Sequence, residues 1–464
     1  MKDWYHWFGV IATHLGPDYE AVEAAELMQM RLIVFAKKSL RGEIKDIETA
    51  VEATGILHVV GNKGGLVVRF SCRDTTFAFV SCHLAAHEGE QYRNARNDNC
   101  REVLEGARVG IPQMDIVPQT DHVFWMGDLN YRLDPYRFGF MSLPDPSKDK
   151  DHQTLPKSGT PEHKEVWDKI QELIAAEDWE ELAKHDELRE ELQKKHVLSG
   201  FEEGVPNFPP TFKVLALKKL QKKWDEGSLE PAKHPLMWTE QRWPSYTDRV
   251  LWHSHPTKLG DVTQMDLRNV PEALTSDHKP VQSLFSIMLR PKPTLLPVKQ
   301  PAEAPEIWIS GLEGHDGIKA MDATGKSDPY IFFYCPELGI DFDPENPAKQ
   351  FVTAIKNQTL NPKWDDSEIP TLPCMTADKD VLKNSHLMLC MQDFDSLNPD
   401  DDMGFACINL GPFIEDEGDF NAAIVLQGQQ AGWVKGHIKM AWPEDGVRQK
   451  REFQGGGGCE CIVS

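Results

Sequence analysis

The chain has 464 residues and a mass of 52.6 kDa, with 40% hydrophobic and 27% charged residues. This length predicts two or three domains, and this composition excludes a mainly disordered chain. No apolar run approaches the roughly 18 residues that a membrane-spanning helix needs. Nine cysteines without zinc-like spacing favour a reducing compartment, so we expect a cytoplasmic protein. The net charge of −23 argues against nucleic acid as a partner.

The first part of the chain, residues 1–289, alternates short apolar runs with helical stretches. The runs at 64–72, 76–84 and 122–130 are apolar on both faces, which predicts strands inside a layered sheet. Residues 161–196 place apolar and charged residues at helical spacing and predict one or two surface helices.

The second part begins with a proline-rich segment, residues 290–305, which predicts a semi-rigid linker. In residues 306–445 short β-type runs are broken by Asp, Gly and Pro turns, which is typical of an all-β sandwich. This region carries a net charge of −16. The last residues, 446–464, form a glycine-rich tail.

Polar motifs follow several of the apolar runs in the first part. They read GNKGG (61–65), SCHLAAH (81–87), GDLNYR (127–132), PPTFK (209–213), WPSYTDRVLW (243–252) and TSDHKPV (275–281). The ends of strands are where a sheet presents polar side chains to a ligand. Singly, each motif could be only a turn or a surface ion pair. His83 and His87 have the spacing of a metal pair on a helix, but we expect His83 to end a strand instead.

Together, these residues suit hydrolysis of a phosphoester assisted by Mg²⁺. Asp128 and Asn130 alternate with apolar neighbours, so we expect both on one side of a strand end, holding a water and a phosphate oxygen. An Asp beside a His, as with Asp248 or Asp277 and His278, can present the imidazole to a phosphate. Basic side chains then clamp further phosphates, and the candidates are Lys63, Arg132, Lys213, Arg249 and Lys279.

The motifs in this order, from Trp4 to Val281, resemble the inositol polyphosphate 5-phosphatases. The resemblance implies an α/β DNase I-like two-sheet sandwich of the endonuclease/exonuclease/phosphatase type. It implies that Asp128 orients the attacking water, while Asn130 and His83 contact the scissile phosphate. The remaining implied roles are Asp248 polarising His278, Asp277 lying near Mg²⁺, and Lys213 and Arg249 receiving the neighbouring 4-phosphate.

One part of the family pattern has no equivalent in this sequence. Family members begin with two strands that carry a WN and a QE motif, and the QE glutamate is the principal magnesium ligand. Glu20, Glu23 and Glu26 fall in a stretch that matches a later helix of the family. The sequence therefore predicts either a shortened start or a catalytically impaired form.

The acidic second part carries patterned aspartates in DATGKSDPY (322–330) and QDFDSLNPDDDMG (392–404). Carboxylates that converge from two loops suit Ca²⁺, although acidic loops are also common as solvated surfaces. The SDPY, LNPxW and DxDxxxxxDxxG patterns resemble C2 domains. The resemblance maps the calcium ligands onto Asp322, Asp328, Asp393, Asp395 and Asp401.

The last four residues, Cys461 to Ser464, form a C-a-a-X motif, which predicts farnesylation of Cys461 and a prenyltransferase as partner. One prenyl chain binds membranes reversibly, so stable anchoring needs a second signal such as the C2 domain. We expect a peripheral protein on the cytoplasmic face of membranes, attracted there by anionic lipids once Ca²⁺ is bound.

These observations give three functional hypotheses. The main one is a Mg²⁺-dependent 5-phosphatase acting on phosphatidylinositol 4,5-bisphosphate or 3,4,5-trisphosphate, and possible competing substrates are soluble inositol polyphosphates. The second is a calcium-dependent adaptor that binds phosphoinositides without turning them over, supported by the missing WN and QE motifs. The third is a nuclease or sphingomyelinase of the same fold, against which PPTFK and the surrounding basic residues argue.

Overall fold

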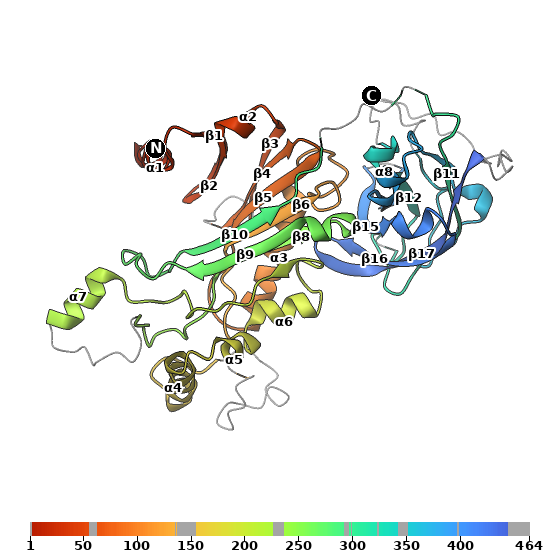
Figure 1. Cartoon of the computed structure of the whole chain (residues 1–464). Helices are drawn as coiled ribbons and strands as arrows, with labels where there is room; N and C mark the ends of the chain where they lie inside the picture. Colours follow the sequence, from red (N-terminus) through yellow and green to blue (C-terminus); the bar gives the residue numbers. More distant parts are fainter. Residues whose placement is uncertain are drawn as a thin grey trace. The chain divides into compact units, whose positions relative to one another are not determined.

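The computed structural model describes residues 2–54, 63–134, 136, 155–225, 236–291, 297, 299–322, 324–341, 351–396 and 399–443. The chain divides into two compact units (Figure 1). The first comprises Met1–Gly110, Thr120–Ser254 and Asp261–Pro291, and the second comprises Ile111–Gln119, His255–Gly260 and Lys292–Ser464. The glycine-rich tail with Cys461 lies outside the described residues.

A six-stranded mixed sheet of order β3-β4-β5-β6-β8-β7 forms the centre of the first unit (Figure 1). Its strands are β3 (Ile44–Ala53), β4 (Gly64–Cys72), β5 (Thr75–His83), β6 (His122–Asp128), β7 (Glu202–Glu203) and β8 (Asp248–Ser254). β5 and β6 run parallel, and the other neighbours are antiparallel. The three strands predicted at 64–72, 76–84 and 122–130 are confirmed as β4, β5 and β6.

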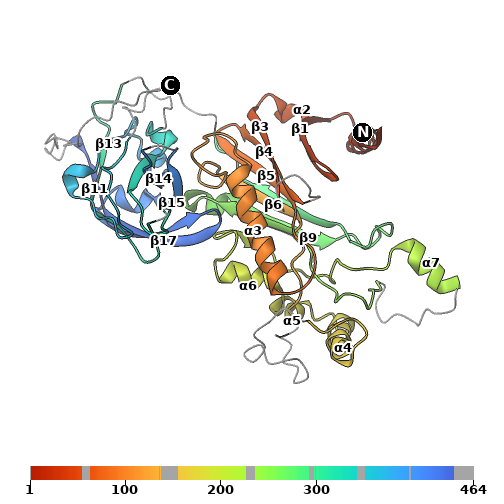
Figure 2. The ribbon, with the colours of Figure 1, turned by 180° about the vertical axis from the view of Figure 1, so that it is seen from behind.

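Both faces of this sheet are covered. Two antiparallel pairs, β1 (Tyr19–Leu27) with β2 (Met30–Lys37) and β9 (Val262–Asn269) with β10 (Val281–Ile287), contribute to an apolar cluster on one face. There the rings of Phe124 and Phe285 lie 5.0 Å apart. Helix α3 (Glu90–Gly106) crosses the other face (Figure 2), where Val103 packs against the bare Cα of Gly65.

The stretch with Glu20, Glu23 and Glu26 is strand β1, so the expected helix is wrong. A register shift between Ala21 and Glu23 interrupts the alternation of the strand. Because of this bulge, Val22 and Ala25 are both buried although they stand three positions apart. The three-residue spacing of these buried side chains is thus produced by a bulged strand.

Three helices, rather than one or two, occupy residues 161–196: α4 (Pro161–Ala175), α5 (Trp179–Lys184) and α6 (Glu187–Gln193). Asp178 and Asp186 cap the second and third helices, accepting hydrogen bonds from the backbone N–H groups of Glu181 and Arg189. These caps begin new helices at points where the spacing of apolar residues alone predicts one continuous helix. The remaining helices of this unit are α1 (Lys2–Leu15), α2 (Lys38–Arg41) and α7 (Leu217–Asp225).

The second unit contains a seven-stranded antiparallel sheet of order β12-β14-β15-β16-β17-β11-β13, which confirms the all-β expectation (Figure 1). Its strands are β11 (Glu306–His315), β12 (Pro329–Tyr334), β13 (Leu372–Pro373), β14 (His386–Asp393), β15 (Asp401–Asn409), β16 (Gly418–Leu426) and β17 (Gln429–Ala441). One short helix, α8 (Lys379–Lys383), accompanies them. The sheet curls around a core that includes Ile307, Phe333 and Ile438. Among the helices of the described ranges, none is both long and apolar enough to cross a bilayer.

Candidate active site

The register of the central sheet aligns the ends of four strands. His83 at the end of β5 lies opposite Asp128 at the end of β6, and Asp128 lies opposite Asp248 at the start of β8. On the other side of His83 stands Gly64, which follows Lys63 directly. Directly opposed residues point to the same face of a sheet, so three of the expected side chains form one row.

Gly127 allows β6 to approach β5 at this row. Its φ is +129°, and a Cβ there would lie 2.1 Å from the carbonyl oxygen of Cys82. Only glycine satisfies both constraints. The glycine of the GDLNYR motif therefore brings Asp128 beside the end of β5.

Asp128 is the centre of the cluster. Its Oδ2 lies 3.2 Å from Nε2 of His83 and 4.0 Å from Nε2 of His278. Burial alone would raise the pKa of Asp128, but the hydrogen bond from His83 and the nearby cations together lower it. Asp128 is therefore held ionised, as an acceptor for the proton of a water molecule must be.

Lys63 completes this side of the cluster, because its Nζ contacts Nε2 of His83. Burial lowers the pKa of Lys63 to about 8, against the opposing attraction of Asp128. The lysine thus carries a poorly solvated positive charge, which an anion would stabilise.

His278 is held by Asp248, as expected. Its Nδ1 lies 3.1 Å from Oδ2 and 3.2 Å from Oδ1 of Asp248. Burial disfavours the charged imidazole, but the hydrogen bond and the charge of Asp248 outweigh it and raise the pKa of His278. With Nδ1 engaged, Nε2 is the ring nitrogen directed toward Asp128.

Two threonines that the sequence analysis missed fix Asp248. Thr211 Oγ1 donates to its Oδ2 over 2.6 Å, and Thr247 Oγ1 donates over 3.0 Å. Both residues are buried. Thr211 lies in PPTFK and Thr247 precedes Asp248, so their place inside two recognised motifs was the available signal.

Asn130 does not stand beside Asp128 on one strand face, because β6 ends at Asp128 and Asn130 has a left-handed φ of +57°. Its amide nitrogen donates to the carbonyl of Leu84, and its Oδ1 accepts from Nη2 of Arg132 over 2.6 Å. The residue is only 3% exposed. Asn130 thus braces Arg132 in this structure, and its contact with the scissile phosphate stays a prediction.

Arg132 is a buried cation whose charge interacts with that of Asp128. It is 3% exposed, its guanidinium lies 4.6 Å from the centre of the Phe212 ring, and burial lowers its pKa to about 10. Among the described residues, its buried Nη1 has no hydrogen-bond partner. A buried cationic donor of this kind suits a phosphate oxygen.

Phe212 lies between Arg132 and His278, since its ring centre is also 4.5 Å from that of His278. The neighbouring Lys213 places Nζ 3.8 Å from Oδ2 of Asp277, and both side chains are partly exposed. The expected Lys213 and Asp277 thus lie beside His278, accessible from solvent.

Two expected phosphate ligands lie elsewhere. Arg249 is 3% exposed and donates from Nη1 to both carboxylate oxygens of Asp186 at 2.9 Å, while Nε donates to Glu203 over 2.6 Å. Lys279 is fully buried, and its Nζ donates to the carbonyl oxygen of Ala273 over 2.5 Å. These contacts correct the expectation, because neither side chain reaches the Asp128 cluster.

A magnesium ion needs oxygen ligands, usually one or two carboxylates together with substrate phosphates and waters. Asp277 supplies one partly exposed carboxylate, and its charge and that of Asp128 both act on His278. Asp128, Asp248 and His278 also place ligand atoms within 4.8 Å of one another. This donor set fits the minimum that Mg²⁺ requires.

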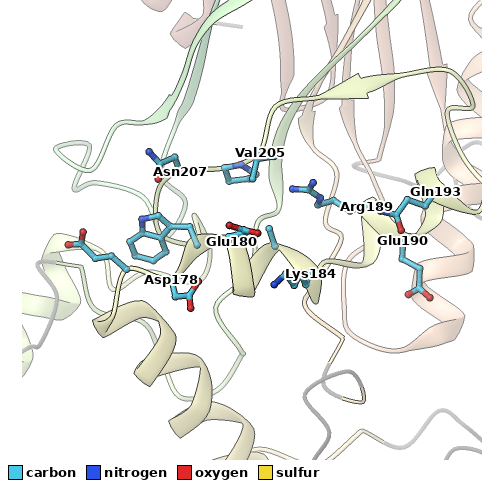
Figure 3. A pocket seen from close by; sticks show the side chains of 12 residues that line it. Asp178, Glu180, Lys184, Arg189, Glu190, Gln193, Val205 and Asn207 are labelled. Atoms are coloured by element: carbon cyan, nitrogen blue, oxygen red, sulfur yellow. The ribbon is translucent and has the colours of Figure 1, made fainter.

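A separate pocket of about 700 Å³ lies between α5, α6 and residues 205–207 (Figure 3). Charged side chains of both signs line it, including Glu180, Lys184 and Arg189. None of its lining residues belongs to the Asp128 cluster, and we assign it no role in the chemistry.

In the second unit, the register places Asp393 opposite both Pro329 and Asp401. Oδ1 of Asp393 accepts a hydrogen bond from the backbone N–H of Asp328 over 2.5 Å. Burial and the nearby charges of Asp322 and Asp328 raise the pKa of Asp393. Four of the five expected calcium ligands are therefore drawn together at one end of the sheet.

The fifth expected ligand, Asp395, is oriented by a residue that the sequence analysis did not single out. Asp400 accepts from the backbone N–H of Asp395 over 3.0 Å through Oδ1 and from the hydroxyl of Tyr330 over 2.7 Å through Oδ2. Its position in a run of three aspartates was the only signal.

The first unit thus carries a row of Asp and His side chains at the strand ends of a mixed sheet. A family model described as endonuclease/exonuclease/phosphatase family 2 matches residues 3–160 and 161–284, and a C2 model matches residues 311–425. The chain belongs to the endonuclease/exonuclease/phosphatase family 2 and carries a C2 domain. This confirms the expected α/β two-sheet fold of DNase I type and the expected C2 sandwich.

Among curated proteins, the chain is 29% identical to type II inositol 1,4,5-trisphosphate 5-phosphatase of Mus musculus over 61% of its length and 24% of the relative. It is 25% identical to phosphatidylinositol 3,4,5-trisphosphate 5-phosphatase 2B of Danio rerio, over 96% of its length and 32% of the relative. The chain thus spans about a third or less of these relatives.

Among solved structures, the chain is similar to the inositol polyphosphate 5-phosphatase domain of a synaptojanin, crystallised with inositol (1,4)-bisphosphate and a calcium ion. The identity is 24%, the TM-score is 0.41, and the match covers 59% of this chain and 65% of that chain.

Proposed function

We propose that this chain hydrolyses the 5-phosphate of phosphoinositides, phosphatidylinositol 4,5-bisphosphate or 3,4,5-trisphosphate, at the cytoplasmic face of a membrane. The single observation that carries the proposal is the row of His83, Asp128 and Asp248, with His278 held by Asp248. Similarity to relatives named as inositol and phosphatidylinositol 5-phosphatases supports the substrate class.

The charges of the cluster assign the steps. Asp128, held ionised by its neighbours, orients a water molecule and accepts its proton as the water oxygen attacks phosphorus. The bond from phosphorus to the inositol oxygen breaks, this oxygen takes up a proton from solvent and leaves as the inositol alcohol, and inorganic phosphate is released. His278 donates from Nε2 to a phosphate oxygen while Asp248 stabilises its positive charge, and His83 contacts the same phosphate.

Three cations remain to bind phosphate groups. Lys63 is partly buried and Arg132 is buried near Asp128, and the pKa of each is lower than in water, so an anion would stabilise their charged forms. Lys213 is partly exposed beside Asp277 and would receive the 4-phosphate. Arg249 and Lys279 are omitted from this set because their contacts are internal.

Asp277, together with Asp128 and the substrate, would hold Mg²⁺, which supplies Lewis-acid stabilisation of the charge that develops on the phosphate. Recruitment would come from two other parts of the chain. Ca²⁺ at Asp322, Asp328, Asp393, Asp395 and Asp401 would convert a repulsive acidic rim into one that binds anionic lipid. Farnesylation of Cys461 would add a reversible anchor.

The test is phosphate release from short-chain phosphatidylinositol 4,5-bisphosphate, with Mg²⁺ or with EDTA. We expect release that depends on Mg²⁺ and is lost in Asp128→Asn. The matched control is Asp266→Asn, which removes a partly exposed carboxylate paired with Arg268 on β9. Equal turnover by Asp128→Asn and the control would refute the assignment.

A second measurement separates the enzyme from the adaptor. If no variant of the chain releases phosphate while Ca²⁺ still drives binding to vesicles that contain phosphatidylinositol 4,5-bisphosphate, the calcium-dependent adaptor is the correct function. Cleavage of abasic DNA under the same conditions would instead favour a nuclease of the same fold.

A further inference from the structure

One face of the sheet in the second unit is covered by segments from earlier in the chain. All eight residues of β14 are buried, so both of its faces are covered. On one side lies the core of the sandwich, with Leu387 and Leu389. On the other side, Met388 and Cys390 pack with Met114, which belongs to the segment Ile111–Gln119 of the same unit.

The same covered face brings together three side chains that can bind a transition metal. The register pairs Met388 with Cys407 and His386 with Asn409, so His386 and Cys407 are diagonal neighbours on one face of β14 and β15. The segment His255–Gly260 of the unit adds His255, whose Nδ1 lies 3.9 Å from Sγ of Cys407. All three ligand atoms lie within 4.8 Å of one another.

The chemistry of this cluster is that of a soft divalent cation. Imidazole and thiolate are the preferred ligands of Zn²⁺, with Zn–N near 2.0–2.1 Å and Zn–S near 2.3 Å. A tetrahedral arrangement with these lengths separates nitrogen from sulfur by roughly 3.6 Å, close to the observed 3.9 Å. His255 and His386 are 2% and 5% exposed, and Cys407 is partly exposed.

A neighbouring hydroxyl supports the site from outside. Thr257 Oγ1 lies 3.2 Å from Nδ1 of His386 and can fix the orientation of that ring. Metal-binding histidines usually have such a partner on the second nitrogen, which leaves Nε2 for the metal.

We propose that His255, His386 and Cys407 form a zinc site that ties the segment His255–Gly260 to the outer face of β14 and β15. Three protein ligands leave a fourth position for water. The site is separate in the fold from the carboxylates that we assign to Mg²⁺ and Ca²⁺, and it does not depend on the proposed phosphatase activity.

Two changes would accompany binding. Burial raises the pKa of the Cys407 thiol, so the thiol is neutral without a metal, and zinc would displace its proton. The rings of His255 and His386 are stacked, with centres 4.2 Å apart and planes at 19°. Because imidazole binds a metal in the plane of its ring, one ring must turn about its side-chain bonds to share the ion.

The test uses Co²⁺ as a spectroscopic probe, with Zn²⁺ as competitor. The full chain carries Cys459→Ser and Cys461→Ser to remove the tail thiols, and excess Ca²⁺ occupies the acidic loops. We expect one equivalent of Co²⁺ to produce the near-ultraviolet band of a thiolate–cobalt bond, and Zn²⁺ to abolish it. The band should disappear in Cys407→Ser, and His386→Gln should weaken Co²⁺ binding by at least about tenfold.

Matched controls are Cys374→Ser, a buried thiol outside the cluster, and His437→Gln, a histidine of the same unit paired with Asp419. Both should keep the band. Absence of a thiolate–cobalt band in the parent chain, or an undiminished band in Cys407→Ser, overturns the proposal and leaves the cluster as packing alone. Circular dichroism of each variant confirms that it is folded.

Discussion

His83 and Asp128 lie directly opposite each other at the ends of the parallel strands β5 and β6, with Nε2 of the histidine 3.2 Å from Oδ2 of the aspartate. A parallel pair in register delivers two side chains to the same edge and face of a sheet. The antiparallel strand β8 then adds Asp248 to the same row. The row of His83, Asp128 and Asp248 is thus a consequence of strand pairing, and the segment that precedes β10 adds His278 to it.

Removing the charge of Asp248 tests this arrangement. Asp248→Asn keeps the size of the side chain but removes the charge that raises the pKa of His278. We expect kcat to fall by about 10²–10⁴, the range for a positioned acid–base group. The residual activity should begin to fall at a lower pH than in the parent chain, because the pKa of His278 falls and its charged form persists only at lower pH. A kcat–pH profile measures both effects.

The control for this variant is Asp266→Asn, which makes the same chemical change in a pair that is open to solvent. Its profile should match that of the parent chain. If Asp248→Asn retained the parent pH profile, Asp248 would not act through His278.

The lowered pKa of Lys63 predicts how substrate affinity changes with pH. Since this pKa is about 8, the lysine is cationic below pH 8 and loses its charge as the pH rises through that value. We expect KM for phosphatidylinositol 4,5-bisphosphate to rise above pH 8 while kcat changes less. Lys63→Arg should extend the low-KM range upward, because arginine stays protonated there.

Lys218→Arg on α7 provides the control, since this exposed lysine lies outside the motifs of the site. It should leave the profile unchanged. An identical rise in KM for the parent chain and Lys63→Arg would mean that another group titrates.

Much of the site could be predicted from the sequence because its residues end buried strands. His83 and Asp128 follow long apolar runs, and the structure places both in one row. The order of the strands was not readable, because the pairing of β6 with β8 joins segments more than 100 residues apart. Such non-local pairing leaves no periodic trace in a sequence.

The errors have a common cause in the alternation of strands. Asp248 and Arg249 are adjacent on β8, so their side chains point to opposite faces, one toward His278 and the other toward Asp186. A motif that contains both residues suggests that both act at the same site, but neighbouring residues of a strand face opposite sides of the sheet. The expected position of Asn130 on the same strand face as Asp128 was wrong, because β6 ends at Asp128 before the alternation reaches Asn130.

The internal contacts of Arg249 predict a structural effect rather than a kinetic one. Arg249→Met leaves Asp186 and Glu203 as buried carboxylates without their counter-charge. Breaking such a buried network costs about 3–5 kcal/mol. We expect this loss in the free energy of unfolding, measured with urea, and an unchanged KM for the folded fraction.

Arg268→Met is the matched control, since its partner Asp266 is partly exposed and the pair should contribute no more than about 1 kcal/mol. Glu203→Gln, which keeps the hydrogen-bonding shape, should give a smaller loss than Arg249→Met and serves if that variant does not fold. If Arg249→Met were fully stable but had a raised KM, Arg249 would bind substrate, as the sequence analysis expected.

The crowded carboxylates of the C2 domain predict that the effect of Asp393→Asn on stability changes sign when Ca²⁺ is added. Burial and the charges of Asp322 and Asp328 raise the pKa of Asp393, so its ionised form is less stable than that of a solvated aspartate. Asp393→Asn relieves this repulsion and keeps an oxygen that can accept from the N–H of Asp328. Without Ca²⁺, we therefore expect the variant to be at least as stable as the parent chain.

With Ca²⁺ the order reverses. At about 100 times its dissociation constant, a ligand that binds only the folded state adds about 2.7 kcal/mol, so the parent chain should gain a higher Tm that Asp393→Asn does not share. Asp419→Asn, an exposed aspartate of the same unit paired with His437, should respond to Ca²⁺ as the parent does. An equal gain in Asp393→Asn would show that calcium stabilises the domain without this carboxylate, and the acidic loops would then be solvated surface.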